Sequence, residues 1–384
     1  MNYTWIRNIQ EWKSRREGIP IGHATNQGRE LLRISPEAFG SHSLVVGQPR
    51  TGKTNALTHL AAGWLRRGQS LIAIDAKGDL VDALLGQVPR HRVSDVVFVD
   101  LTDQNRAIGL NPIQMTPGCD PDARVASVVR AARRVWHEHW DLDVEGLLTA
   151  GLYTLIAANQ VLAKQGEPQF TVLDLTHLFD SPTFRRRLLN EFVHNPLLSY
   201  WWIGDYERQF LEKRVDIFEP FLNLLHIWTG HATTRHILGQ SDSTVDLRQL
   251  VRARGILLVK TDARRLCYER GELATACLLE QLLSAIRDER ANAPRTWRDP
   301  LPIFVDGHEP LIYPDHPGML AELKGMGVTL AVATETLAEL DQGVIPWSEE
   351  LLASDPNLFV FRTNLQDAER LQPELNRVNS TQTE

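Results

Sequence analysis

The chain alternates short apolar runs with helix-like stretches in its first hundred residues. Three runs rich in β-branched residues end at or just before a glycine or an aspartate: Ser43–Val46, Leu71–Asp75 and Val96–Asp100. The stretches between the first two runs and after the second, about 54–68 and 80–86, have the apolar spacing of helices. Continuous apolar runs are typical of strands that are buried on both faces of a parallel sheet. The pattern therefore predicts βαβ units.

Helical patterns replace the strand-like runs in the middle of the chain, and the strand-like runs return near its end. Strand-like runs recur at 256–259, 303–305, 329–333 and 358–361. Between them and the first group, long helical patterns predominate, at 122–136, 144–164 and 206–228. We predict an α/β fold: a mostly parallel sheet with helices on both faces and an inserted all-helical domain. The expected boundaries are 1–119 and 251–375 for the two parts of the sheet domain, 120–250 for the insertion and 376–384 for a disordered tail.

Charge and composition narrow the class of protein. Lysine and arginine number 41 against 48 acidic residues, a net charge of −7, so a chain that coats nucleic acid electrostatically is excluded and any such contact must be local. No apolar run reaches the ~18 residues of a membrane helix, and the N-terminus lacks a signal-like apolar region. We expect a cytoplasmic protein without a transmembrane segment. Three cysteines without a Cys-x-x-Cys pair predict neither disulfides nor a zinc site.

The strongest chemical signal follows the first strand. Positions 47–54 match the P-loop pattern G-x-x-x-x-G-K-[ST], between a predicted strand and a predicted helix. The glycines let successive backbone N–H groups point at phosphate oxygens, and the helix adds its positive N-terminal end. We expect Lys53 to reach the β- and γ-phosphates of ATP and Thr54 to bind Mg²⁺. The whole cradle is Gly47, Gln48, Pro49, Arg50, Thr51, Gly52, Lys53 and Thr54.

A P-loop site also needs an acidic residue at the end of another buried strand. Asp306 ends the run 301–306 and is the favoured metal ligand beside Thr54. Asp75 and Asp100 also end strand-like runs and compete for this role. Asp75 follows the P-loop helix too soon for an ATPase with an additional strand, which favours Asp306.

Four further motifs carry a resemblance to a known family. They are D-A-K-G-D-L at 75–80, G-L-N-P at 109–112, the strand and helix at 327–340, and F-R-T at 361–363 followed by D-A at 367–368. With the P-loop and Asp306, they resemble the HerA/FtsK superfamily of hexameric P-loop DNA-pumping ATPases, and most of all the conjugative type IV secretion coupling proteins. The resemblance runs from about Ile21 to Leu371.

The resemblance implies a RecA-like P-loop fold, ATP and Mg²⁺ as cofactors, DNA as a partner, a homo-hexamer, and contacts with a relaxase or relaxosome or with secretion-channel proteins. A partner of this kind would bring the chain to the membrane. It makes Asp306 the Walker B aspartate, Glu335 the sensor and Arg362 a residue near a subunit boundary. Two positions depart from the family pattern: Gly307 stands where a glutamate normally follows the aspartate, and Glu335 replaces a glutamine. Because a carboxylate repels a γ-phosphate, the sequence supports ATP binding more strongly than ATP hydrolysis.

Several roles stay open at this level. Glu309 would replace the missing catalytic glutamate if the strand continued past Gly307, and is otherwise a surface carboxylate. Arg362 and Arg235 compete for the arginine that acts on a neighbouring subunit's nucleotide. The basic clusters 185–187 and 130/133/134 are candidate DNA contacts. The second cluster has helical spacing and is equally a solvated face or a site for an acidic partner.

Four functions therefore compete. They are a motor that moves DNA in conjugation, a cytoplasmic HerA-like DNA-processing ATPase, a nucleotide-gated scaffold with little hydrolysis, and an unrelated P-loop enzyme.

Overall fold

The computed structural model describes residues 18–23, 31–103, 105–209, 213–230, 232–261, 272–290, 299–307, 318–341 and 346–380. Two compact units divide the chain. The first, called here the sheet unit, consists of Met1–Val99, Leu250–Lys260 and Arg287–Glu384. The second, the helical unit, consists of Asp100–Gln249 and Thr261–Ile286. The predicted insertion at 120–250 stays a prediction about domain organisation.

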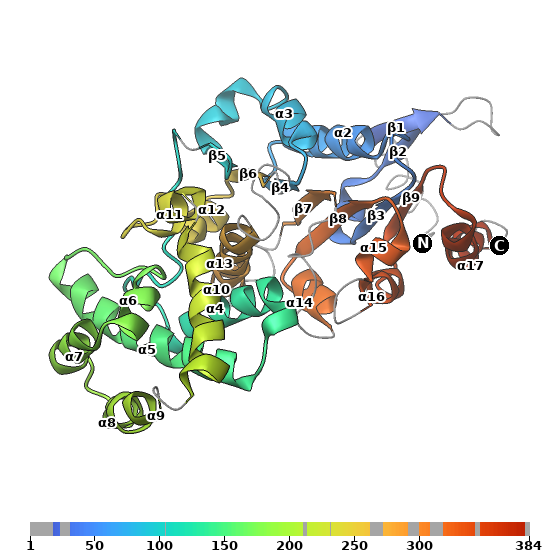
Figure 1. Ribbon diagram of the computed structural model, residues 1–384. Helices are drawn as coiled ribbons and strands as arrows, with labels where there is room; N and C mark the ends of the chain where they lie inside the picture. The colour runs from blue at the N-terminus through green and yellow to red at the C-terminus, as the bar shows by residue number, and fades with distance from the viewer. Residues whose placement is uncertain are drawn as a thin grey trace, which may run out of the picture. The chain divides into compact units, whose positions relative to one another are not determined.

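A seven-stranded sheet runs through the sheet unit in the order β5-β6-β4-β7-β8-β3-β9 (Figure 1). The pairs β6–β4, β4–β7, β7–β8, β8–β3 and β3–β9 are parallel. This confirms the predicted mostly parallel α/β fold. The strands are β3 (Ser43–Val46), β4 (Leu71–Asp75), β5 (Val96–Asp100), β6 (Ile256–Lys260), β7 (Leu301–Asp306), β8 (Val328–Thr334) and β9 (Asn357–Val360).

The first strand of this sheet pairs with two of the last. β3 lies between β8 and β9, with Val46 in register with Thr334 on one side and Val360 on the other. Because all three strands run in the same direction, the loops that follow them leave from one edge of the sheet. Ligands of open α/β sheets bind at this carboxyl edge.

Helices cover both faces of the sheet, as predicted (Figure 1). α2 and α3 lie on one face, and α14, α15 and α16 lie on the other. The helices of the sheet unit are α2 (Lys53–Arg66), α3 (Asp79–Leu85), α14 (Met319–Gly325), α15 (Leu337–Leu340), α16 (Trp347–Ala353) and α17 (Leu365–Ser380), with short 3-10 turns η1 (Pro36–Gly40) and η2 (Arg90–Asp95). α17 extends into the segment 376–384, for which the sequence predicts a disordered tail.

A small hairpin accompanies the sheet and was not predicted. β1 (Ile19–His23) and β2 (Leu31–Ile34) pair antiparallel. Ile19 is buried against α2, where a Cβ on Gly63 would lie 2.6 Å from the Ile19 Cγ2 atom. The glycine therefore permits this close packing. Both strands are short, and β2 is mostly exposed, so their sequences lack a continuous apolar signal.

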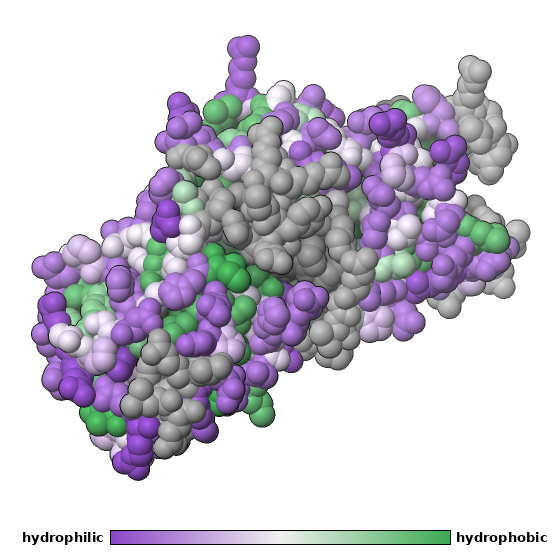
Figure 2. All heavy atoms as spheres, in the orientation of Figure 1, coloured by the Kyte–Doolittle hydropathy of each residue, from purple (hydrophilic) through white to green (hydrophobic). Residues whose placement is uncertain are grey.

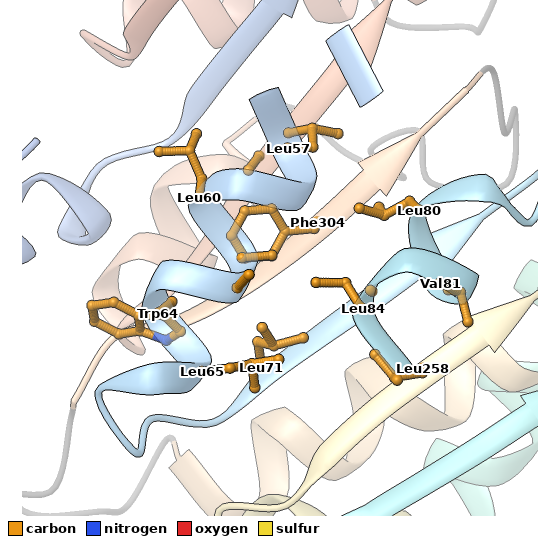
Figure 3. Packing of buried hydrophobic residues seen from close by; sticks show 14 of the residues in the cluster. Leu57, Leu60, Trp64, Leu65, Leu71, Leu80, Val81, Leu84, Leu258 and Phe304 are labelled. Carbon is orange, nitrogen blue, oxygen red and sulfur yellow. The ribbon is translucent and has the colours of Figure 1, made fainter. Parts of the chain in front are cut away.

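The core of the sheet unit forms where α2 and α3 pack on the sheet (Figure 3). Leu57 and Leu65 of α2, Leu80 and Leu84 of α3, and Phe304 of β7 are completely buried there. The apolar residues recur at helical spacing on α2, and β4 and β7 are buried at every position, which agrees with the continuous apolar runs that predicted the strands.

The remaining helices are α4 (Pro121–Val135), α5 (Leu142–Gln165), α6 (Asp174–Asp180), α7 (Pro182–Glu191), α8 (Pro196–Tyr200), α9 (Glu207–Gln209), α10 (Glu219–Gly230), α11 (Ala232–Leu238), α12 (Leu247–Arg252) and α13 (Glu272–Arg290), with the 3-10 turn η3 (His137–His139) and the π-helical segments η4 (Trp201–Tyr206) and η5 (Arg214–Phe218). The single helix expected over 206–228 is wrong. α9, η5 and α10 occupy the described part of that stretch, and η5 leads directly into α10 at Glu219.

Within the helical unit, the G-L-N-P motif forms a buried junction. The Asn111 amide donates to the carbonyl oxygens of Phe170 and Ser241 at 3.0 and 2.9 Å, and its oxygen accepts from the Ile113 N–H at 3.2 Å. Asn111 is 1% exposed. The motif therefore joins three separate segments of this unit, and its role here is structural.

α5 is the described helix that is long and apolar enough to cross a membrane. This is weak evidence for a membrane span, because core helices of soluble proteins can have the same length and composition. α5 packs against α4, α6 and α7, and half of its most apolar window is buried there. Its Asn159 amide donates to the Ile113 and Phe170 carbonyls within the unit.

On the face shown in Figure 2, hydrophilic residues predominate and hydrophobic ones form separate small patches.

We predict that Phe304→Ala lowers the free energy of unfolding of the sheet unit by roughly 3–5 kcal/mol, because it leaves a cavity under α2 and α3. Phe98→Ala is the matched control, since Phe98 is 42% exposed and its truncation opens no cavity. Chemical denaturation followed by circular dichroism measures both. Equal denaturation midpoints for the two variants would contradict the assigned core.

Candidate functional site

The P-loop connects β3 to α2 at the carboxyl edge of the sheet. Gly52, just before α2, has a φ of +107°, and Arg50 has a φ of +63°. A Cβ on Gly47 would lie 2.6 Å from the Phe361 Cβ atom, so only glycine fits. The Thr51 hydroxyl donates to the Gln48 carbonyl at 2.7 Å. The sequence thus forms the strand, loop and helix N-terminus that the motif requires.

Lys53 is folded back over the loop that precedes it. Its Nζ atom donates to the carbonyl oxygens of Gly47 at 2.6 Å and Gln48 at 3.1 Å. Burial lowers the pKa of Lys53, and nearby Glu335 and Asp306 act in the opposite direction. Neutral carbonyls are weaker partners for an ammonium than an anion is, so a phosphate can replace them.

Asp306 ends β7 in a buried position and is incompletely paired. It is 4% exposed, and its Oδ2 atom has no hydrogen-bond partner among the residues that the structure describes. Its carboxylate is hydrogen bonded to the Thr54 side chain. Burial raises the pKa of Asp306, and the neighbouring Asp75 raises it further. A buried carboxylate with a free oxygen beside a hydroxyl fits Mg²⁺, which prefers hard oxygen ligands.

The two competing aspartates differ from Asp306 in how they are paired. Asp75 accepts from the backbone N–H groups of Lys77 at 2.9 Å and Val81 at 3.0 Å, which closes the turn between β4 and α3. Asp100 accepts from the backbone and hydroxyl of Thr102 at 2.9 and 2.6 Å. Both carboxylates stabilise their own turns, whereas no residue in the described part of the chain donates to Asp306 Oδ2.

Glu335 lies at the end of β8, on the same edge. Asp75, Asp306 and Ala333 are in register across β4, β7 and β8. The Glu335 carboxylate is 3.6 Å from the Lys77 ammonium. The predicted sensor therefore lies beside a lysine of the D-A-K-G-D-L motif.

Glu339 was missed at the sequence level. Its Oε2 atom accepts from the Glu335 N–H at 2.9 Å and from the Thr334 hydroxyl at 2.8 Å, and so holds the turn after β8. A signal was present in the sequence. Thr336 and Glu339 have the T-x-x-E spacing of a capping box, and the Thr336 side chain does accept from the Glu339 N–H at 3.3 Å.

Gly307 has a local reason to be glycine. Its φ is +99°, and a Cβ there would lie 3.2 Å from the Ala76 Cβ atom. A glutamate at this position would be strained in this backbone conformation. Glu309, the alternative carboxylate, lies outside the described residues.

The two candidate arginines make different contacts. The Arg362 Nε donates to the Gln48 side chain at 3.1 Å, and the Gln48 N–H donates to the Arg362 carbonyl at 2.8 Å. Arg362 is thus tied to the P-loop of its own chain. Arg235 belongs to the helical unit, where its guanidinium donates to the carbonyls of Thr229 and Gly230 at 3.0 and 2.8 Å.

Several arginines of the two basic clusters form ion pairs within the helical unit. Arg185 is 2% exposed and is paired with Glu207 at 3.1 Å. Arg130 and Arg134 pair with the completely buried Glu280 at 2.9 and 2.8 Å. These ion pairs stabilise the unit. Two of the three arginines at 130/133/134 therefore have an acidic partner within the chain and do not form a solvated face.

Solved structures resemble this fold at low sequence identity. The bacterial conjugative coupling protein TrwBdeltaN70 is 18% identical with a TM-score of 0.57, over 90% of this chain and 73% of that one. VirB4 of Thermoanaerobacter pseudethanolicus is 13% identical with a TM-score of 0.59, over 94% and 88%. TrwB in complex with ADP and Mg²⁺ is 18% identical with a TM-score of 0.56, over 89% and 75%. The chain matches no protein-family model and no curated protein sequence.

These likenesses confirm the resemblance at the level of the fold. The architecture of this chain is that of the P-loop proteins TrwB and VirB4, as the motifs predicted. The roles of individual site residues stay predictions.

We predict that Asp306→Asn and Asp75→Asn shift stability in opposite directions. The raised pKa of Asp306 means that its favourable contribution is present below the unfolded-state pKa of about 4 and is lost as the pH rises through the folded-state pKa. An uncharged asparagine should therefore raise the melting temperature of the nucleotide-free protein at pH 7. The gain should shrink toward pH 4.

Asp75→Asn should instead destabilise by about 1–3 kcal/mol, because one backbone N–H loses its carboxylate acceptor. Thermal unfolding in a chelator between pH 4 and pH 8 tests both variants. A lower melting temperature for Asp306→Asn at pH 7 would contradict the view that Asp306 is an uncompensated buried charge.

Proposed function

We propose that this protein binds ATP with Mg²⁺ and is an ATP-driven motor of conjugative DNA transfer. The observation that carries the proposal is the Oδ2 atom of buried Asp306, which accepts no hydrogen bond from any described residue and lies beside Thr54 at the start of the P-loop helix. The fold likeness to TrwB, a coupling protein solved with ADP and Mg²⁺, supports it.

Each residue of the cradle has a task in this proposal. The backbone N–H groups of Gly47–Thr54 and the positive end of α2 hold the phosphates. Lys53 leaves the Gly47 and Gln48 carbonyls and binds the β- and γ-phosphates. Thr54 and Asp306 hold Mg²⁺, which supplies positive charge to the phosphoryl oxygens when bound. Burial of Asp306 keeps water away from this contact.

Hydrolysis needs a group that orients or deprotonates the attacking water. Gly307 has no side chain, so we propose Glu309 for this role. Arg362 and Arg235 are the proposed sources of positive charge from a neighbouring subunit. Since Arg362 already contacts Gln48 of its own P-loop, it is as well placed to act within one subunit.

The motor would work as a homo-hexamer that places basic side chains around a DNA channel, with the inserted domain at 120–250 reaching a relaxase, relaxosome or secretion-channel partner. Net charge of −7 confines DNA contact to such a channel. We place the protein in the cytoplasm, with a partner bringing it to the membrane.

A HerA-like DNA-processing ATPase uses the same site. A nucleotide-gated scaffold is the second function, and Gly307 is the observation that favours it.

We predict that Lys53→Ala weakens binding of Mg²⁺ and a non-hydrolysable ATP analogue by at least tenfold, since a hydrogen bond between charged groups is worth about 1.5–3 kcal/mol. Isothermal titration calorimetry measures the affinity. Lys324→Ala is the matched control, because Lys324 lies on α14 and donates to the Ser354 carbonyl away from the P-loop. Equal affinities for the two variants would contradict nucleotide binding at this P-loop.

We predict that Glu309→Gln lowers the steady-state ATPase rate in the presence of DNA by ~10²-fold or more, as expected for loss of a general base. Nucleotide affinity should not change. Equal rates for wild type and variant would exclude this role for Glu309. A wild-type rate at background, with intact ATP binding, would favour the scaffold, and a monomer in Mg²⁺ and ATP analogue without DNA stimulation would favour an unrelated P-loop enzyme.

A further inference from the structure

A second lysine faces the phosphate site from a different strand. Lys77 follows β4 in the D-A-K-G-D-L motif, and its own N–H donates to Asp75 at 2.9 Å. The next residue, Gly78, has a φ of +93° and directly precedes α3. Backbone contacts therefore fix the start of the Lys77 side chain, while its end is 46% exposed. The side chain is anchored at its base and open to a ligand at its tip.

Two observations place the Lys77 ammonium near the P-loop. It lies 3.6 Å from the Glu335 carboxylate at the end of β8. The strand register aligns Asp75, two residues before Lys77, with Asp306. Lys77, Lys53 and the proposed Mg²⁺ ligand Asp306 thus converge on one edge.

Glu335 is the partner that Lys77 would have to leave. The backbone of Glu335 is held by Glu339, but its side chain is 37% exposed and free to rotate toward solvent. An ion pair this exposed is weak, so a more highly charged anion can replace the carboxylate. The γ-phosphate of a bound triphosphate is such an anion.

We propose that Lys77 binds the γ-phosphate and that Glu335 is its counter-ion when no γ-phosphate is present. This inference rests on the proposed function. The exchange distinguishes ATP from ADP, because only the triphosphate carries the group that replaces Glu335. It also accounts for an acid at the sensor position: the carboxylate is neutralised before ATP binds and is released to solvent afterwards. Release of Glu335 at the turn between β8 and α15 would report the bound state.

Lys260 offers a matched control on the same edge of the sheet. It ends β6 in register with Asp75. The Lys260 side chain is only 18% exposed, and its ammonium lies 2.5 Å from the carboxylate of the more exposed Asp82. Lys260 is therefore held in a close ion pair within the sheet unit, and its replacement should not change the preference for ATP over ADP.

The test compares affinities for Mg²⁺ with a non-hydrolysable ATP analogue and for Mg²⁺ with ADP, by calorimetry. We expect Lys77→Met to weaken triphosphate binding about tenfold or more, the size of a lost charge-assisted hydrogen bond, and to leave ADP affinity within about twofold. Lys77→Arg should restore part of the preference. Glu335→Gln should bind the triphosphate as tightly as wild type or more tightly, because the competing carboxylate is gone. Lys260→Met should keep the wild-type ratio of the two affinities.

Two results overturn the inference and are distinguishable. Equal weakening of ADP and triphosphate binding by Lys77→Met, with an unchanged melting temperature, assigns Lys77 a general electrostatic role and removes the proposed discrimination. Wild type that binds neither nucleotide, or a Lys53→Ala variant that binds both normally, overturns the proposed function itself and the inference with it.

Discussion

The parallel pairing of β3 between β8 and β9 is the constraint on which the rest of the site depends. It joins a strand near the start of the chain to two strands near its end, with Val46 level with Thr334 and Val360. The loops after these strands therefore meet. Phe361, just past β9, approaches Gly47 so closely that no side chain fits there. The shape of the phosphate cradle is thus decided by residues more than 300 positions further along the chain.

The site also holds charges that the folded protein does not fully compensate. Asp306 is buried, with one oxygen that no described residue pairs, and the half-buried Lys53 contacts neutral carbonyls. Each arrangement disfavours the charged form of the group, as the raised pKa of Asp306 and the lowered pKa of Lys53 indicate. A bound metal ion and phosphate would relieve both. Incompletely compensated charges are common at functional sites. They explain why a residue that binds a ligand can lower the stability of the protein when the ligand is absent.

Motif residues outside the cradle divide into those that support the fold and those that face the site. Asp75, Asn111 and Asp367 are saturated by backbone or neighbouring side chains, Asp367 through Leu337 and Asn364. Lys77 and Glu335 are half-exposed and paired with each other. A resemblance between sequences treats all five alike. Only the hydrogen-bond partners separate the structural residues from those that a ligand can reach.

The sequence by itself determined the seven strands of the sheet and the P-loop, because buried strands and phosphate cradles leave local patterns that periodicity and spacing detect. The role of Asp306 as a strand-end acid stays a prediction. The sequence did not predict the β1–β2 hairpin, the π-helical segments η4 and η5 or the role of Glu339. Nor did it predict that Lys77 pairs with Glu335, or that Arg130 and Arg134 surround Glu280. Those depend on which distant segments share an edge or a core, and burial and pairing are properties of the assembled structure that no local pattern contains.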